Sequence, residues 1–483
     1  MSRSRGSAWV EGTLPLTPLP FRGGAFVTLW TSSEIAVATG GVASADFAVS
    51  GVAFDSREVG PGDLFIALAG EATDGHRFLD QAFAQGAGGA IVSADCAGPH
   101  VRVADTTDAL GALGAASRER SHARIIGVTG SVGKTGTKEA LYACLDRAAP
   151  GHAHRSVKSY NNHTGVPLSL ARMPRDAAFG VFEMGMNHAG ELAALTRLVR
   201  PHIALVTTIA PAHTEFFADE AAIADAKGEI FEGLEPGGTA IVPFDSPHRD
   251  RLIAAARPHA ARILTFGLGE GADVRAAESF RQSNGETFIT ARLPEDELSF
   301  TLGLPGAHWI ANAMGVLAAV WAAGGDLASA GLALGDMGGL PGRGARLTVP
   351  AEGGTATIID ESYNANPASM AATLKVLGAE DARRRIAVLG EMRELGAKSA
   401  DYHAGLAEHV LAANVDFALL VGPGMAALAS ALEGRVELVH APDAATARAR
   451  LTAMLRDGDA VLIKGSNAVG LGGVVQALAG GKG

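Results

Sequence analysis

Short apolar runs alternate along most of the chain with longer segments in which apolar residues recur at helical spacing. The short runs predict buried strands, and the longer segments predict amphipathic helices. Strands that alternate with helices are typical of sheets that carry helices on both faces. The chain is therefore expected to belong to the α/β class.

The C-terminal third carries this pattern most clearly. Its apolar runs predict strands at 355–360, 385–390, 417–422, 436–440 and 460–465, and four segments with helical spacing separate them. This order predicts a doubly wound parallel sheet, in which ligands bind beyond the carboxyl ends of the strands. Asp360, residues 390–392 and residues 464–466 follow such strand ends, so they are expected near a ligand.

The middle third repeats the alternation, and strands are predicted at 124–130, 177–185, 203–210, 238–245 and 262–269. After Gly269 the pattern predicts short strands with a turn at 283–285, followed by an apolar helix at 308–324. The N-terminal part predicts a smaller α/β module with strands at 63–70 and 90–95.

These segments predict three domains, with a Gly- and Pro-rich linker at 335–347. The expected boundaries are 1–28 for a disordered extension, 29–112 for the first domain, 113–340 for the second and 341–483 for the third.

The composition argues against nucleic-acid binding, a cysteine-based metal site and a membrane-spanning or secreted protein. Among the 483 residues, 40 are Lys or Arg and 51 are Asp or Glu, so a net charge of −11 provides no broad positive field for nucleic acid. The two cysteines, Cys96 and Cys144, have no partners at metal-ligand spacing, which fits a reducing cytoplasm. We predict no membrane span, because charges or Gly and Pro residues interrupt every long apolar run. Prolines likewise break the N-terminal segment, so no signal peptide is expected.

The strongest local motif is GVTGSVGKTGTKEAL at 127–141, between a predicted strand and a predicted helix. The backbone amides of a glycine-rich loop can surround phosphate oxygens, Lys134 can neutralise the β and γ phosphates, and the Thr135 hydroxyl can bind Mg²⁺. The nearer glycine is Gly130, whereas Val128 occupies the position that the general spacing gives to glycine. A nucleotide site is nevertheless the favoured interpretation over a structural turn.

Other polar residues follow the neighbouring strands. Glu183 and His213 could bind a metal beside a phosphate loop, although alone each would more often be structural or exposed. Lys227 lies on a predicted amphipathic helix, where a solvated lysine is the ordinary interpretation. The polar segment 159–170, which includes a Gly–Val–Pro turn, could be a substrate loop or an ordinary one.

Several of these segments occur together in the order known from one family. They are TGSVGKTGTKE, NNHTGVPLSL, FEMGMNHAGEL, APAHTEFF, AKGEIFEGL, GRGARL, DESYNANPASM, GEMRELG and IKGS. On these motifs the chain resembles the Mur ligases of peptidoglycan synthesis over about residues 29–483, and most closely the members that add D-alanyl-D-alanine. The resemblance implies a cytoplasmic, monomeric, three-domain ATP- and Mg²⁺-dependent ligase. Its substrates would be UDP-N-acetylmuramoyl-tripeptide and D-alanyl-D-alanine, joined through an acyl phosphate.

The resemblance also implies roles for particular residues. Those implied to contact ATP are Thr129, Gly130, Ser131, Val132, Gly133, Lys134, Thr135, Gly136, Asn312, Arg343 and Asp360. Those implied to act in catalysis are Lys134, Glu183, His213 and Lys227. Those implied to hold Mg²⁺ are Thr135, Glu183, His213 and, if carbamoylated, Lys227. Those implied to contact the uridine nucleotide are Ser56, Arg57, Asp74 and His76. Those implied along the muramoyl-peptide path are Asn161, Asn162, His163 and Thr164, and those near the dipeptide are Tyr363, Asn364 and Asn366.

The chain departs from the family pattern at Gly136, where Thr or Ser is common, at Asn467, where Arg is common, and in its N-terminal extension. Four alternatives remain: a related ligase that adds the diamino acid, a folylpolyglutamate synthetase-like ligase, a P-loop GTPase or kinase, and a nucleotide sensor. The missing DNPR segment disfavours the ligase that adds the diamino acid. The DSR-containing first domain disfavours the folylpolyglutamate synthetase-like ligase, and the missing NKxD segment disfavours a GTPase. The sequence does not distinguish lysine from diaminopimelate as the third peptide residue.

Overall fold

The computed structural model describes residues 27–70, 73–212, 214–283 and 286–480. Its internal contacts divide the chain into two units: Met1–Val37 with Gly41–Ala104, and Ala38–Gly40 with Asp105–Gly483. The predicted extension at 1–28 lies outside the described residues except for Val27 and Thr28. Within the described ranges, no helix is long and apolar enough to cross a membrane.

The first unit is built on a five-stranded sheet. In spatial order its strands are β2 (Val42–Ala43), β7 (His100–Arg102), β6 (Gly89–Val92), β5 (Asp63–Ile66) and β4 (Gly51–Ala53). The strands from β7 to β4 are parallel, and β2 pairs antiparallel with β7. β1 (Trp30–Thr31) and β3 (Ala48–Val49) form a separate pair, and the helices are α1 (Ser32–Thr39) and α2 (Leu79–Ala84). The two strands predicted here correspond to β5 and β6.

The second unit begins with a nine-stranded sheet. In spatial order its strands are β16 (Glu297–Leu302), β15 (Thr287–Arg292), β14 (Val274–Arg281), β13 (Arg262–Gly267), β12 (Thr239–Pro243), β11 (Ile203–Val206), β8 (Arg124–Thr129), β10 (Phe179–Glu183) and β9 (Ala153–Arg155). The strands from β14 to β9 are parallel, whereas β15 runs antiparallel to both of its neighbours, β14 and β16. The strands predicted after Gly269 therefore extend the same sheet. Two residues of the turn predicted at 283–285, Asn284 and Gly285, lie outside the described residues.

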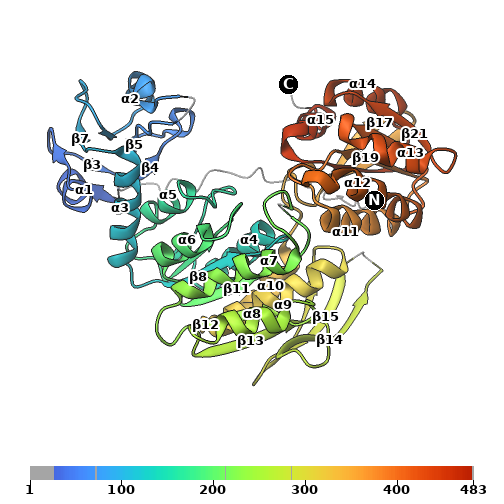
Figure 1. Cartoon of the computed structure of the whole chain (residues 1–483), viewed down its shortest axis with the longest axis horizontal. Helices are drawn as coiled ribbons and strands as arrows, with labels where there is room; N and C mark the ends of the chain where they lie inside the picture. Colours follow the sequence, from blue (N-terminus) through green and yellow to red (C-terminus); the bar gives the residue numbers. More distant parts are fainter. Residues whose placement is uncertain (1–26, 71–72, 213, 284–285, 481–483) are drawn as a thin grey trace, which may run out of the picture. The chain divides into compact units, whose positions relative to one another are not determined.

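Helices cover both faces of this sheet (Figure 1). One face packs against α4 (Lys134–Ala148), α9 (Ala307–Ala322) and α10 (Leu327–Asp336). The other packs against α5 (Gly165–Ala171), α6 (Glu191–Val199), α7 (Glu220–Gly228) and α8 (Arg249–Ala256). Alternation along β8 explains how one strand serves both cores, because Ile126 and Val128 face the first group and Ile125 faces the second.

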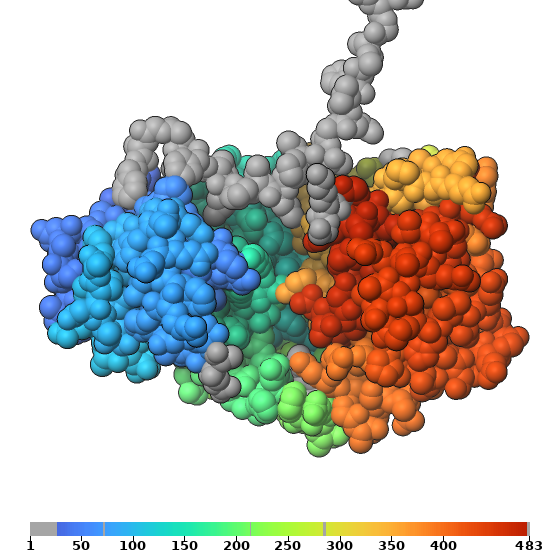
Figure 2. Space-filling model, turned by 90° about the horizontal axis from the view of Figure 1, so that it is seen from above, coloured from blue at the N-terminus to red at the C-terminus, as the bar shows by residue number. Residues whose placement is uncertain are grey.

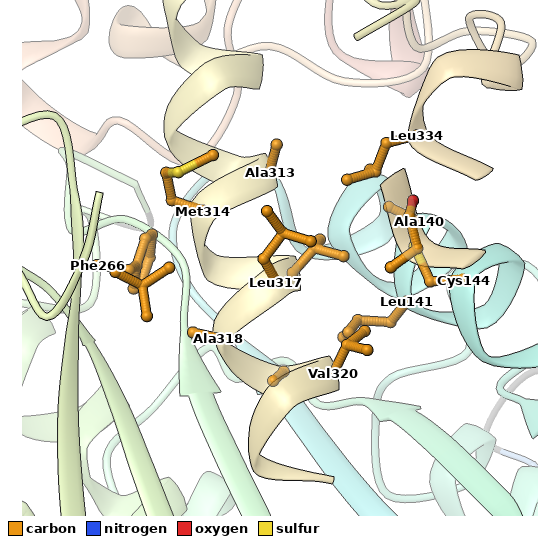
Figure 3. Packing of buried hydrophobic residues seen from close by; sticks show 14 of the residues in the cluster. Ala140, Leu141, Cys144, Phe266, Ala313, Met314, Leu317, Ala318, Val320 and Leu334 are labelled. Carbon is orange, nitrogen blue, oxygen red and sulfur yellow. The ribbon is translucent and has the colours of Figure 1, made fainter. Parts of the chain in front are cut away.

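The predicted apolar helix at 308–324 is α9, and it is buried between two layers. Figure 3 shows Phe266 of β13 on one side of α9, with Ala140, Leu141 and Cys144 of α4 on the other. A helix that is apolar on most of its faces needs cover on most of its faces, so α9 serves as the centre of this core.

A six-stranded sheet forms the C-terminal part of the second unit. In spatial order its strands are β17 (Ala345–Ala351), β18 (Gly354–Glu361), β22 (Asp459–Lys464), β19 (Arg384–Gly390), β20 (Phe417–Val421) and β21 (Glu437–Ala441). Its helices are α11 (Pro367–Gly378), α12 (Ser399–Ala412), α13 (Ala426–Leu432), α14 (Ala444–Met454) and α15 (Leu471–Leu478). In Figure 2 the orange and red residues of this part form one rounded body. All five predicted strands are present, and the α/β fold class is confirmed.

Three details differ from the expectations. The C-terminal sheet is not wholly parallel, because β17 pairs antiparallel with β18 and takes in the last residues of the expected linker. The predicted Gly–Val–Pro turn is wrong: Gly165, Val166 and Pro167 open α5, where proline is tolerated in the first turn. The boundary expected between residues 112 and 113 falls inside α3 (Thr106–Glu119), which packs against α5.

Candidate active site

The phosphate loop connects β8 to α4 in a shape that requires glycine at two positions. Gly130 has φ 149° and Gly133 has φ 88°, conformations that other residues rarely adopt. A Cβ atom on Gly130 would also overlap the Thr207 hydroxyl. Gly133 is the N-cap of α4, so the loop amides and the helix N-terminus point toward the same small region, which suits an anion.

The loop is fixed by the strand beside it. The Thr207 hydroxyl, which follows β11, donates to the carbonyl of Val132 over 2.6 Å. The Ser131 hydroxyl accepts from the Ala210 amide over 3.1 Å, and the Ser131 amide donates to Thr208. Thr129, at the end of β8, is fully buried. The loop is therefore preorganised by polar contacts to residues 207–210.

Lys134 is bent back onto this loop. Its ammonium donates to the carbonyl of Gly130 over 2.7 Å. Burial lowers the pKa of Lys134, the charge of Glu183 raises it, and the charge of Arg343 lowers it. The lysine and Arg343 thus share one electrostatic environment, in which an added polyanion would be stabilised.

Thr135 and Glu183 meet at the entrance to α4. The Thr135 hydroxyl donates to Glu183 Oε2 over 2.8 Å, and Asn161 Nδ2 donates to Glu183 Oε1 over 2.8 Å. Glu183 is 1% exposed at the end of β10. A hydroxyl beside a carboxylate offers the oxygen ligands that Mg²⁺ prefers, with phosphate oxygens supplying further ones. The described residues contain no cluster of three or more His, Cys, Asp or Glu side chains suited to a metal.

Ser159 joins this group, although the sequence analysis did not select it. Its hydroxyl lies 3.3 Å from the Thr135 hydroxyl and accepts from Arg343 Nη2 over 3.1 Å. Arg343 also stacks over the ring of Tyr363, 4.2 Å from its centroid. The only sequence signal was its position at the start of the polar segment 159–170, so its contact partners were not predictable.

Asp360, in β18, contacts the linker through Gly342. It is 5% exposed, and its carboxylate accepts from the Gly342 amide over 2.7 Å and from the Ser362 amide and hydroxyl over 3.1 and 2.6 Å. These bonds fix the turn that carries Arg343. That Asp360 also reaches ATP stays a prediction.

Lys227 is buried and is not a solvated lysine of a helix surface. It lies in the last turn of α7 and is 1% exposed. Burial, with the nearby charge of Lys134, lowers its pKa well below the ordinary value. A lowered pKa favours the uncharged amine, which is the nucleophilic form of lysine. His213, its expected partner at a metal, lies outside the described residues.

Asn312 of α9 lies beside the phosphate loop, and Gly136 of α4 faces α9. The Asn312 amide is 9% exposed and lies close to Gly133, 3.1 Å from where a Cβ of that glycine would be. Gly136 contacts the indole ring of Trp309. The Thr or Ser that is common at position 136 would therefore clash with this tryptophan.

The predicted muramoyl-peptide residues divide into two groups. Asn161 is bound to Glu183, as described above. Asn162 Oδ1 accepts from the Thr164 and Gly165 amides directly before α5, while His163 is exposed. The Thr164 hydroxyl also donates to Asn162 Oδ1, so the side-chain contacts of both residues are local.

The predicted dipeptide residues follow β18. Tyr363 is 38% exposed and lies against Arg343. The carbonyl of Asn364 accepts from Lys464 Nζ over 3.0 Å. Asn366 is the N-cap of α11 and forms a capping box with Ser369, so its side chain already has a local structural role.

In the first unit, the four residues predicted at the uridine nucleotide follow two neighbouring parallel strands. Ser56 follows β4 and binds Gln81, and Arg57 is exposed and paired with Asp55 over 2.6 Å. Asp74 and His76 follow β5 and are joined by a 2.6 Å contact, while His76 Nε2 accepts from the Ser93 amide. Ser56 and Arg57 therefore lie at the same carboxyl edge of the sheet as Asp74 and His76.

Together, the phosphate loop and this fold define a nucleoside-triphosphate-binding protein with additional α/β parts. Family models agree with this description: the Mur ligase middle domain matches 128–320, the glutamate ligase domain of Mur ligases matches 345–467, and the catalytic domain of the Mur ligase family matches 48–118. A relative from Escherichia coli (strain K12), UDP-N-acetylmuramoyl-tripeptide–D-alanyl-D-alanine ligase, is 36% identical over 92% of this chain and 96% of its own. The chain belongs to the Mur ligase family.

Solved structures agree over nearly the whole length. A crystal structure of MurF from Acinetobacter baumannii superposes with a TM-score of 0.80 and 31% identity, covering 93% of this chain and 99% of the other. MurF ligase from Thermotoga maritima in complex with ADP gives a TM-score of 0.73 and 25% identity, covering 89% and 97%.

Proposed function

We propose that this protein is an ATP-dependent ligase that adds D-alanyl-D-alanine to UDP-N-acetylmuramoyl-tripeptide, a step of peptidoglycan precursor synthesis. The observation that carries the proposal is the alignment of 92% of the chain with an Escherichia coli ligase of that activity. The paired Thr135 and Glu183 beside a formed phosphate loop supply the matching chemistry.

The reaction requires activation of a carboxylate, because a carboxylate ion is a poor electrophile. ATP transfers its γ-phosphoryl group to the terminal carboxylate of the tripeptide, the amine of D-alanyl-D-alanine attacks the acyl phosphate, and phosphate leaves. The first step brings two anions together. Lys134, Arg343 and the amides of Gly130, Val132 and Gly133 are the groups that would lower this repulsion, because the Ser131 amide already donates to the carbonyl of Thr208.

The residues present suit Mg²⁺. Thr135 and Glu183 would hold one ion, and Lys227, if carbamoylated, would hold a second together with His213. Bound Mg²⁺ neutralises phosphate charge during phosphoryl transfer. The low pKa of Lys227 favours the uncharged amine that a carbamate needs.

The remaining site residues follow from the same assignment. Asn312 would contact the adenine side of ATP, and Arg343 and Asp360 would complete the nucleotide site from the linker. The uridine nucleotide would bind Ser56, Arg57, Asp74 and His76, the peptide would pass Asn161 to Thr164, and the dipeptide would bind near Tyr363, Asn364 and Asn366. We place the enzyme in the cytoplasm, because its nucleotide substrates are cytoplasmic, and we propose a monomer by analogy with the family.

Phosphate release from ATP and Mg²⁺ tests the proposal. We expect release only when both a UDP-N-acetylmuramoyl-tripeptide and D-alanyl-D-alanine are present, with separate assays for the lysine and diaminopimelate tripeptides. Release that depends on a free diamino acid with the dipeptide precursor would instead identify a ligase for the third residue. ATP binding without any turnover that depends on acceptor and amine would contradict the ligase assignment.

A further inference from the structure

Lys138 is a lysine with no exposed surface in the second turn of α4, one turn after Lys134. Its side chain is 0% exposed, which is uncommon for lysine unless its charge is fully compensated. Lys138 has no part in the ATP, Mg²⁺ or substrate contacts described above.

The ammonium of Lys138 binds two backbone carbonyls and a carboxylate. It donates to the carbonyl of Ser156 over 2.9 Å and to that of Lys158 over 2.5 Å. Glu139 Oε1 lies 2.9 Å away, and Glu183 Oε2 lies 4.0 Å away. The two carbonyls belong to the segment Ser156–Ser159, which follows β9, whereas Glu139 lies on α4 and Glu183 ends β10.

This segment is connected to the catalytic group at both ends. At its start, the Ser156 hydroxyl accepts from the Glu183 amide over 3.2 Å. At its end, Ser159 contacts Thr135 and Arg343 as described above. Between them, Lys158 has φ 53°, a left-handed conformation that costs free energy and persists only where neighbouring contacts impose it.

The charge of Lys138 has a local counter-ion other than Glu183. Glu139 binds Lys138 through Oε1 and Arg155 through Oε2, the latter over 2.8 Å. Glu183 is therefore free to face Thr135 and Asn161, while Lys138 adds a positive charge behind it. A close ion pair between Lys138 and Glu183 would instead compete with a metal ion for the Glu183 carboxylate.

We infer that Lys138 is a positioning residue for the acceptor side of the active site, holding Ser156–Ser159 so that Ser159, Asn161 and Glu183 keep their places. The inference rests on the proposed ligase function and deepens it. Among the described residues, the hydrogen-bond and ion-pair partners of the Lys138 ammonium lie outside the phosphate loop. Its removal is thus expected to disturb the acceptor far more than ATP.

The test compares Lys138→Met, Lys138→Arg and Thr137→Val. Thr137 is the matched control, since it neighbours Lys138 in the same turn, is 1% exposed and has a hydroxyl with no hydrogen-bond partner among the described residues. ADP affinity and thermal melting report on the phosphate loop and the fold. Steady-state kinetics report KM for the UDP-N-acetylmuramoyl-tripeptide, KM for ATP, and kcat.

Lys138→Met is expected to raise the acceptor KM at least about tenfold and to lower kcat, while ADP affinity and the KM for ATP change by less than about threefold. Lys138→Arg keeps the charge and the donors but is larger, so its acceptor KM is expected to lie between those of wild type and Lys138→Met. Thr137→Val is expected to match wild type.

Acceptor kinetics in Lys138→Met equal to those of Thr137→Val would overturn the inference, as would equal losses for ATP and acceptor. If Lys138→Met does not fold, Lys138→Arg decides: a raised acceptor KM with unchanged ADP affinity supports the positioning role, and wild-type kinetics overturn it. A wild-type protein without acceptor-dependent turnover would instead refute the proposed function, so the two failures are distinguishable.

Discussion

Gly136 packs directly against the indole ring of Trp309, so that a Cβ atom at residue 136 would lie 2.6 Å from Cη2 of that ring. Real Cβ atoms do not approach other atoms so closely, and Trp309 is only 9% exposed and cannot easily move away. The departure from the family's Thr or Ser at position 136 is thus matched by a bulky residue on α9.

Gly136→Ser is therefore expected to destabilise the protein by about 1–2 kcal/mol, because overpacking outweighs the better helix propensity of serine. Urea denaturation measures the change. In the Trp309→Phe background, the shorter ring leaves room for the serine, so the same substitution is expected to cost less. Equal costs in both backgrounds would show that the ring is not the obstacle.

Lys134→Ala is expected to lower kcat by roughly 10³-fold, because one cation is lost from the phosphates. The fold is expected to remain as stable as wild type or more so, since burial lowers the pKa of Lys134 and the alanine no longer buries a charge. Phosphate-release rates and thermal melting check both parts. Retained turnover in Lys134→Ala would contradict the role of Lys134 in binding the phosphates.

Lys227→Ala is expected to be inactive and to regain part of its activity with formate or acetate, which replace the carboxylate of a carbamate. Lys227→Arg is the control, because its side chain cannot form a carbamate and also fills the space that an added carboxylate needs, so no rescue is expected for it. The uncharged amine implied by the lowered pKa of Lys227 is the form that reacts with carbon dioxide. Rescue in neither variant, with full wild-type activity in buffer free of carbon dioxide, would argue against the modification.

The buried His154 is expected to make the free energy of unfolding fall at acidic pH. Burial lowers the pKa of His154 to about 4, and its Nε2 lies 2.8 Å from the carbonyl of Ser169. As pH falls below about 6.5, the unfolded chain binds a proton at this histidine before the folded chain does, so stability is lost between pH 6.5 and 4. The loss from pH 7 to pH 5 is expected to be about 2 kcal/mol.

His154→Gln is the matched variant, since its amide can still donate to Ser169 but does not titrate. Free energies of unfolding at pH 7 and pH 5 are expected to show the pH-dependent difference between wild type and variant. Parallel pH profiles for the two proteins would mean that His154 is not the responsible group.

The sheets were predictable because their strands are continuous apolar runs. Residues 203–206 and 417–421, which form β11 and β20, are buried at every position and read as strands without further information. β17 was obscured because it directly follows a Gly- and Pro-rich stretch and contains Pro350, and a proline within a run argues against a strand. The start of α5 was misread because Gly and Pro together ordinarily indicate a turn.

The phosphate loop was predictable because local sequence determines its shape. The contacts of Ser159 and Lys138 were not, since they depend on how β9 and β10 align beside β8, and β9 has only three residues. The burial of Lys227 likewise comes from tertiary packing, because the same helical spacing occurs in helices whose lysines face solvent.

The close approach of α3 to α5 determines where a shortened protein can begin. A Cβ atom at Gly114 would lie 3.0 Å from Pro167, and Leu110 and Leu113 of α3 are buried. Arg118 of the same helix donates to the carbonyls of Val199 and Arg200, which end α6. A truncated chain starting at residue 113 would lose half of α3, expose α5 and invite aggregation, whereas one starting at Asp105, the N-cap of α3, would retain the helix intact.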